Sequence, residues 1–513
     1  MESKKKTPSD PSLHARQIEY IAEDTLEKHD PAFNAAIKGQ ATTGYEELGV
    51  VETIKTFKLC TLVCFAMAFS AATDGYQIGI NASVIANTGF ISRFATTVGK
   101  DGKPALASPI LSGWSAIMSC GQILGMTTLP FLSSRYGRKP AMFTYWIVIV
   151  GSVLTECLAR SWQGWLVAKF LAGIGVGCLQ STVPTYISEV APTRIRGGLL
   201  MCYSFWWTLG SFFAQVALQH LSKSDKTNYL TPIYTQWAQV GIMLLIYVFI
   251  PESPAWCVNT GKHDRAKKQL LILNRGVPNY DLERQFQALV MAVEHEREVA
   301  AEQRREKWYA IFQGTNGLRT VISCWTNLSQ QLIGLSLFGT FGTYFFQQAG
   351  LEDPFKIEVI TNSIQIATET TRVLRDDHML VILYGYRHYR DVGLAANGAT
   401  GWGYIGEVSS QRLRPYTAGF AAAVTCVAGV MMNVLIPYMT NSNKWNWGLK
   451  TGWFYFGVGL PFVVGMWLLI PETSGRSAAE LDELFERKIK PWRFHKTETA
   501  TQRLVHLSKA EDN

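Results

Sequence analysis

Residues 186–197 read YISEVAPTRIRG, and residues 404–415 read YIGEVSSQRLRP, so the same pattern returns 218 positions later. Residues 250–254 (IPESP) and 470–474 (IPETS) match at an offset of 220 positions. Each of these four segments lies at the end of a long apolar run. Two matches at nearly one spacing indicate that the chain contains a duplicated half-unit.

The apolar runs are long enough to cross a membrane. The chain has 513 residues, of which 48% are hydrophobic and only 17% are charged, against about 25% charged in soluble proteins. A helix of about 20 apolar residues crosses a hydrocarbon core. This excludes a soluble globular protein and predicts an all-α polytopic membrane protein. The expected spans are 57–80, 110–132, 141–158, 164–187, 199–218, 236–250, 320–346, 392–407, 417–439 and 452–470.

Lysine and arginine concentrate in alternate loops, and this bias places both termini in the cytosol. Within the polar middle segment, Leu282, Phe286, Leu289 and Val293 recur at helical spacing, which predicts an amphipathic helix, with a solvated charged linker as the alternative. The expected parts are a cytosolic tail (1–56), an N-terminal bundle (57–251), a cytosolic linker with amphipathic helices (252–317), an incomplete C-terminal bundle (318–470) and a second cytosolic tail (471–513).

The second half is shorter than the first. Glu189 lies 132 residues after the start of the first span, whereas Glu407 lies only 87 residues after the start of the seventh. Residues 369–391 carry many acidic and basic side chains, each of which costs about 2.5–3.5 kcal/mol at the centre of a bilayer. We therefore expect about two helices to be missing from the second half.

Charged residues recur where the repeated segments leave the spans. Opposite charges in such places can pair and separate as a protein changes conformation, which would make them a gate. The alternative is that they only set the topology. The candidates are Arg135, Arg138, Glu189, Arg196, Glu407 and Arg414.

Polar side chains inside the spans suggest a site for a neutral polyol. Gln330 and Gln331 lie in the seventh span, where amides are costly unless they face a cavity or a partner. An amide both donates and accepts hydrogen bonds, as recognition of a sugar requires. Trp402 can stack on a sugar face, or it can anchor its helix at the membrane interface.

Asp74 and Lys169 are ionisable residues inside the first and fourth spans. A carboxylate readily becomes neutral in a low dielectric, so an Asp74–Lys169 pair is a candidate for proton coupling. The alternative places Asp74 near the outer membrane surface. The nine cysteines lie mostly in apolar runs without metal-ligand spacing, and we expect no catalytic residue, metal, cofactor or nucleic-acid partner.

Several strings together resemble the sugar porters of the major facilitator superfamily, and in particular the fungal maltose/α-glucoside and hexose permeases. They are RYGRK (135–139), PTYISEVAPTRIRG (184–197), PESP (251–254), QQLIG (330–334), GYIGEVSSQRLR (403–414) and PETSGR (471–476). The resemblance covers about residues 50–365 and 392–495. It implies a major facilitator fold of two six-helix halves, here with family spans eight and nine missing. It also implies alternating access rather than enzymatic chemistry.

Carried over by position, the resemblance implies a sugar site between the halves, with the six charged residues as the inner gate. Ser204 and Ser336 stand where the family usually has an amide and an asparagine. The first-span aspartate of its proton symporters corresponds to Gln77, one helical turn from Asp74. The substrate-binding candidates are Gln330, Gln331, Trp402, Ser204 and Ser336.

These features predict a monomeric plasma-membrane protein that imports maltose, another α-glucoside or a hexose together with protons. Its expected partners are the sugar, protons and the lipid bilayer. The missing helices are expected to impair this chain. An uncoupled hexose facilitator and a non-transporting sugar sensor remain as alternatives.

Overall fold

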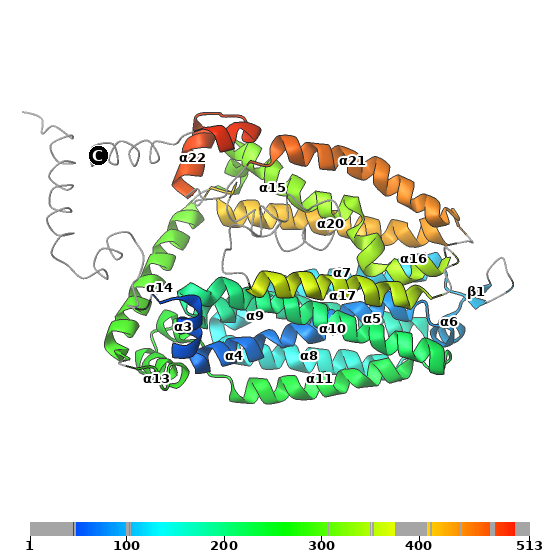
Figure 1. Cartoon of the computed structure of the whole chain (residues 1–513), viewed down its shortest axis with the longest axis horizontal. Helices are drawn as coiled ribbons and strands as arrows, with labels where there is room; N and C mark the ends of the chain where they lie inside the picture. The colour runs from blue at the N-terminus through cyan, green and yellow to red at the C-terminus, as the bar shows by residue number, and fades with distance from the viewer. Residues whose placement is uncertain are drawn as a thin grey trace, which may run out of the picture.

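The computed structural model describes residues 45, 48–98, 102, 104–278, 280–305, 307–348, 350, 353–374, 408–410, 413–441, 444–471 and 478–497. Long helices run roughly side by side in two groups (Figure 1). One group contains the helices of the first half together with the helix of residues 354–374, and the other contains the remaining long helices of the second half. At one end lies a short antiparallel hairpin of β1 (Thr97–Val98) and β2 (Pro104–Ala105), and at the other lie the helices of the polar middle segment. We call these the hairpin end and the linker end.

Helices occupy all six spans predicted for the first half. The first span is built from α4 and α5, with a break at Phe69. The helices are α3 (Val50–Thr56), α4 (Lys58–Ala68), α5 (Ser70–Val84), α6 (Thr88–Phe94), α7 (Ser108–Tyr136), α8 (Arg138–Leu158), α9 (Trp162–Val190), η1 (Thr193–Ile195), α10 (Arg196–Ser224) and α11 (Leu230–Phe249).

Close packing of α7 against α9 depends on glycines. A Cβ added at Gly173 or Gly177 of α9 would clash with the backbone carbonyl oxygens of Met118 or Gln122 on α7. Small residues let two membrane helices approach at backbone distance. The two long helices therefore form a rigid pair in the first half.

The polar middle segment forms α12 (Pro254–Asn259), α13 (His263–Leu273) and α14 (Leu282–Arg305), followed by η2 (Trp308–Phe312). Phe286 and Val293 of α14 are buried against Trp256 and its neighbours on α12, which confirms the predicted amphipathic helix. At the surface, Lys267 Nζ lies 2.7 Å from Glu283 Oε2, and its hydrogen bond lowers the pKa of that carboxyl.

The second half begins with a broken helix. Residue Gly334, with φ of 121°, ends α15 (Gly314–Ile333), and the chain continues through a π-turn (η3, Ser336–Thr340) into α16 (Gly342–Gln348). The remaining elements are α17 (Pro354–Leu374), α20 (Arg414–Thr440), η4 (Gly448–Lys450), α21 (Thr451–Leu469), α22 (Ala478–Glu486) and η5 (Pro491–Lys496).

Helix α17 corrects the sequence prediction. It is 21 residues long, lies along α10 (Figure 1) and fills the eighth place in chain order, so the prediction that this helix is missing is wrong. It was overlooked because it is not uniformly apolar: Ile360 and Ile364 are exposed on its outer side, whereas Asn362 is buried. Residues 375–407 lie outside the described residues, and with them the predicted span 392–407 and any further missing helix.

Seven of the described helices are long and apolar enough to cross a membrane. They are Lys58–Val84, α7, α8, α9, α11, α20 and Gly448–Leu469. Helices α10, α15 and α17 are comparably long but more polar. Helix α10 packs against α5 and α17, and α15 packs against α20 and α21. The chain is a multi-pass membrane protein.

Hydrogen bonds join the two halves near the hairpin end. Each donor or acceptor lies within the first or last two turns of its helix or in the adjoining loop. The bonds are Ser83 Oγ to Thr343 Oγ1 (2.6 Å), Gln347 Nε2 to the Ala86 carbonyl (2.9 Å), Ser108 Oγ to the Pro437 carbonyl (3.0 Å), Ser112 Oγ to the Val434 carbonyl (2.8 Å) and Asn441 Nδ2 to the Leu106 carbonyl (3.0 Å).

Candidate functional site

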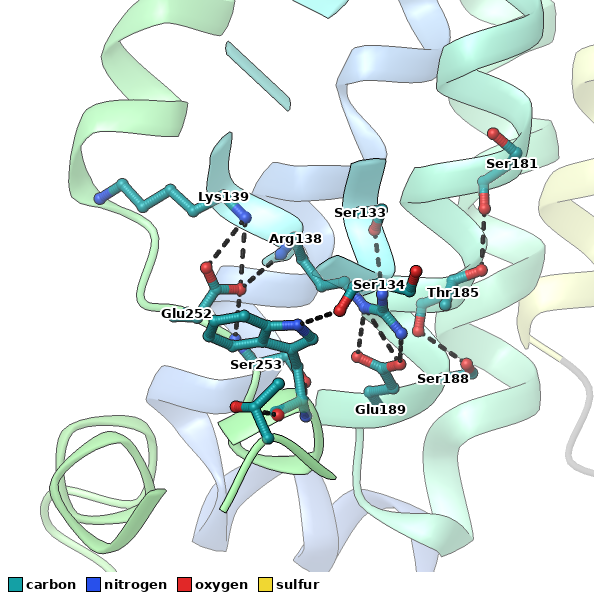
Figure 2. A network of polar contacts seen from close by, with 12 residues as sticks. Ser133, Ser134, Arg138, Lys139, Ser181, Thr185, Ser188, Glu189, Glu252 and Ser253 are labelled. Carbon is teal, nitrogen blue, oxygen red and sulfur yellow. Dashed lines mark hydrogen bonds and ion pairs between the residues drawn. The ribbon is translucent and has the colours of Figure 1, made fainter. Parts of the chain in front are cut away.

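At the linker end, one of the predicted gate contacts is formed (Figure 2). The guanidinium of Arg138, at the start of α8, donates from Nε to Glu189 Oε2 (3.0 Å) near the end of α9, and from Nη1 to Ser133 Oγ (3.0 Å). Both residues belong to the first half. In this arrangement the pair therefore braces two helices of one half rather than bridging the halves.

A second carboxylate, Glu252, completes this network, and the sequence analysis did not assign it. Its Oε1 accepts hydrogen bonds from the backbone N–H groups of Arg138 (2.8 Å) and Ser253 (3.0 Å). The turn before α8 is formed by Gly137, with φ of 116°, and an added Cβ there would clash with Glu252. The repeated IPESP and IPETS strings carried the signal, because both contain a glutamate at this place.

The other gate candidates are not brought together in the described part of the chain. Arg135 is exposed, with its guanidinium 5.8 Å from the ring centre of Tyr136. The Nε atoms of Arg196 and Arg414 are buried without a hydrogen-bond partner among the described residues. Glu407 lies outside those residues.

The predicted sugar ligands of the second half gather at the break after α15. Ser336 Oγ donates to Gln331 Oε1 (3.0 Å), and the Gln331 amide lies against Gly429 of α20. Gln330 is buried beside it in sequence. On α10, Ser204 is half-buried, and its carbonyl accepts from Thr208. Trp402 lies outside the described residues.

Lys169 is paired with a carboxylate that the sequence analysis overlooked. Its Nζ lies 2.9 Å from Glu156 Oε1, and both side chains are buried. Glu156 also accepts from Gln77 Nε2 (2.5 Å) on α5 and from Gln236 Nε2 (3.0 Å) on α11. Lys169 donates in addition to Asn81 Oδ1. Three donors from three helices thus hold the Glu156 carboxylate.

Aromatic rings enclose this pair on the side of the hairpin end. The Lys169 ammonium lies 4.1 Å from the ring centre of Trp165, which favours the cation. The Trp165 ring packs edge-on against Phe90 of α6 and Trp114 of α7, with centroids 5.0 Å and 6.4 Å away. Trp165 and Phe90 are almost completely buried, so these rings separate the ion pair from the hairpin end.

Asp74 occupies a different setting, in the middle of the α4–α5 span. It is 1% exposed and is the seventeenth residue of the 27-residue helical segment Lys58–Val84. Its Oδ2 accepts from Gln180 Nε2 (3.0 Å) on α9 and from the Tyr203 hydroxyl (3.3 Å) on α10, while Oδ1 is buried without a hydrogen-bond partner among the described residues. Gln180 in turn accepts from Gln122 Nε2 (2.7 Å) on α7.

The predicted Asp74–Lys169 pair is therefore wrong. Gln77, one turn after Asp74, faces the cation site, and the charge that neutralises Lys169 comes from Glu156. The sequence offered one part of the signal: the short loop between α8 and α9 makes these two helices neighbours, although it does not fix which of their side chains face each other. Glu156 was missed because it lies only two residues from the end of its predicted span.

Comparisons with known proteins agree with this architecture. The general alpha-glucoside permease of Saccharomyces cerevisiae is 25% identical over 89% of this chain and 80% of its own length. The MFS transporter fmqE of Aspergillus fumigatus is 27% identical over 93% of this chain and 97% of its own length. The inward open conformation of the xylose transporter XylE from E. coli superposes with a TM-score of 0.61 at 19% identity, covering 83% of this chain and 98% of that one.

The sequence model of the family described as "Sugar (and other) transporter" matches residues 63–375 and 378–485. The match includes both repeated segments and the broken seventh helix, and it continues through residues that the structure does not describe. It covers far more than half of the chain. The protein therefore belongs to this family of major facilitator sugar transporters, which are permeases and not enzymes.

Proposed function

We propose that the protein imports a neutral sugar, maltose or another α-glucoside or else a hexose, across the plasma membrane together with protons. Both termini would face the cytosol, and the protein would act as a monomer by alternating access. The general alpha-glucoside permease among its relatives supports the sugar class. The Gln331 amide and the Ser336 hydroxyl, placed at a helix break, supply the donors and acceptors that sugar hydroxyls require.

Alternating access fits the contacts between the halves. The hydrogen bonds at the hairpin end close the protein there, and most of them use backbone carbonyl oxygens as acceptors. Rocking of one half against the other would break them and open that end. In this proposal Arg138, Glu189 and the related charged residues at the linker end steady the helices that move.

The observation that carries proton coupling is the setting of Asp74. It is a buried carboxylate in the middle of a membrane span, and its hydrogen-bond donors, Gln180 and Tyr203, are both neutral. Removal from water favours the neutral form of a carboxylate unless a cation lies beside it. Asp74 is thus suited to take up and release a proton. Lys169 was a second candidate, but its charge is already compensated by Glu156.

The test uses the full chain in proteoliposomes. With labelled maltose and glucose, we expect an inward proton gradient to drive accumulation of at least one of the two sugars. Asp74→Asn should abolish this accumulation while sugar exchange without a gradient continues, because only the protonatable group is lost. Lys267→Met, at the exposed surface of the linker, is the matched control and should accumulate sugar normally.

The other outcomes separate the alternatives. Equal uptake by Asp74→Asn and by the unaltered chain, at every pH, would identify an uncoupled facilitator. Sugar binding without flux would identify a sensor, or a chain whose transport is impaired by its short second half. Absence of both binding and flux with either sugar would overturn the proposed sugar class.

A further inference from the structure

Two side chains among the described residues donate hydrogen bonds to Asp74, those of Gln180 and Tyr203. Gln180 is the one that also forms a hydrogen bond with another amide side chain, that of Gln122. Its Nε2 donates to Asp74 Oδ2 (3.0 Å), and its Oε1 accepts from Gln122 Nε2 (2.7 Å). The orientation of the amide is fixed by these partners, since a carboxylate needs the NH₂ group and the Gln122 NH₂ needs the oxygen. The chain Gln122–Gln180–Asp74 therefore connects three helices, α7, α9 and α5.

The exposure of these side chains changes along that chain. Asp74 is almost completely buried, whereas Gln180 and Gln122 are partly exposed in the middle parts of long membrane helices. An amide exposed to hydrocarbon would be costly, so partly exposed amides at this depth face water or substrate. Gln180 thus contacts the buried Asp74 with its NH₂ group and keeps part of its side chain exposed, where water or a polar substrate can approach it.

We infer that Gln180 couples sugar binding to protonation of Asp74, and that Gln122 and Gln180 form the sugar-binding edge of the first half. This rests on the proposed function. When a sugar hydroxyl accepts the hydrogen bond from Gln180 Nε2, Gln180 no longer donates to Asp74. The Asp74 carboxylate then keeps only one of its two donors, Tyr203. The carboxylate then takes up a proton from water at Oδ2, the oxygen that Gln180 has released.

Release reverses the sequence. When the sugar leaves, Gln180 again donates to Asp74, and the carboxylic acid returns its proton to water. Because linkage is reciprocal, protonation tightens sugar binding by the same factor by which sugar favours protonation. Sugar affinity is therefore expected to rise as the pH falls through the titration of Asp74.

The groups around Asp74 are consistent with a single titrating site. Tyr203 on α10 donates to it, and Tyr145 on α8 lies close enough for an electrostatic interaction, with its own hydroxyl buried and without a partner among the described residues. Tyr247 on α11 lies next to Tyr145 and donates to Ser70 on α4–α5. None of these side chains brings a positive charge, unlike Lys169 in the neighbouring site.

The decisive comparison is between the two donors to Asp74. Gln180→Met removes the amide donor, and Tyr203→Phe removes the other. In full-length protein, maltose and glucose affinities measured from pH 5 to 8 should lose their pH dependence in Gln180→Met. The sugar affinity of Gln180→Met should also be about tenfold lower than that of the unaltered chain, a typical size for coupling between two binding sites. In Tyr203→Phe the pH dependence should persist with its midpoint moved to higher pH.

Proteoliposomes that contain a trapped pH dye provide the second readout. Addition of sugar should move protons with the unaltered chain and with Gln219→Met, a control with the same change on α10, but not with Gln180→Met. If Gln180→Met does not insert, Gln180→Asn, whose shorter amide cannot reach both partners, provides the same test.

Retained pH dependence in both Gln180 variants, while the unaltered chain moves protons with sugar, would overturn this inference and leave the proposed function intact. If the unaltered chain moves sugar without protons, the proposed coupling itself fails.

Discussion

Asp74 and Glu156 are both buried carboxylates of the first half, on α5 and α8, and their surroundings differ in one decisive respect. Glu156 forms an ion pair with the cation Lys169 at 2.9 Å and accepts hydrogen bonds from two amides, Gln77 and Gln236. Asp74 has two neutral donors and one oxygen without a partner among the described residues. Equal burial is thus accompanied by a charged partner at one site and by neutral partners alone at the other.

The largest expected effect comes from breaking the fixed pair. Glu156→Gln leaves the Lys169 charge buried without a counter-ion, which typically costs about 3–5 kcal/mol of stability. We therefore expect the melting temperature of Glu156→Gln, measured in detergent, to be much lower than that of the unaltered chain. Asp74→Asn removes no partner of a cation and should change stability by less than about 1 kcal/mol.

The rescue experiment sharpens this comparison. Adding Lys169→Met to Glu156→Gln removes the uncompensated charge and should restore most of the lost melting temperature. If Glu156→Gln and Asp74→Asn destabilise the protein equally, or if the double variant is no better than the single one, the distinction between the two carboxylates is wrong.

A smaller loss of stability is expected when the Trp165 ring, which lies against the Lys169 ammonium, is removed. Trp165→Leu removes the contact with Lys169, worth about 1–2 kcal/mol when desolvated, together with part of the aromatic packing. In the Glu156→Gln, Lys169→Met background the same change should cost about 1 kcal/mol less, because only the packing part remains. Equal costs in both backgrounds would show that Trp165 does not stabilise the ammonium.

The smallest effect is expected at the exposed pair of the linker. Lys267 and Glu283 lie 2.7 Å apart, as close as the buried pair, but water screens them. Glu283→Gln should leave the melting temperature unchanged, whereas Phe286→Ala, which empties a buried position on the same helix, should lower it. A clear loss with Glu283→Gln would show that burial does not account for the difference between these ion pairs.

Much of the fold followed from local patterns. The apolar runs placed helices α4, α5, α7 to α11, α20 and α21, and the spacing of Phe286 and Val293 predicted the packed side of α14. Helix α17 escaped this reasoning because it is not uniformly apolar: Asn362 is buried, whereas Ile360 and Ile364 are exposed. A search for uniformly apolar runs cannot find such a helix, since the average along its length hides the two different sides.

The site was predicted less completely. The sequence singled out Arg138, Glu189, Gln331 and Ser336, and the structure brings each pair together. It also singled out Asp74 and Lys169 but joined them wrongly, and it missed Glu156, Glu252 and Gln180. A lone carboxylate in a membrane span can be recognised from the sequence, whereas its partner depends on which helices are neighbours and how each is rotated.

By itself, then, the sequence indicated that this chain crosses the membrane many times, that two segments recur at nearly one offset, as a duplicated half-unit predicts, and that the chain is similar to sugar porters. These are properties of composition and repetition along the chain. Only the tertiary structure decided which buried acid is paired with Lys169 and which has neutral hydrogen-bond donors alone. Coulombic and hydrogen-bond energies fall off within a few ångströms, so those roles are set by distances between helices that are remote in sequence.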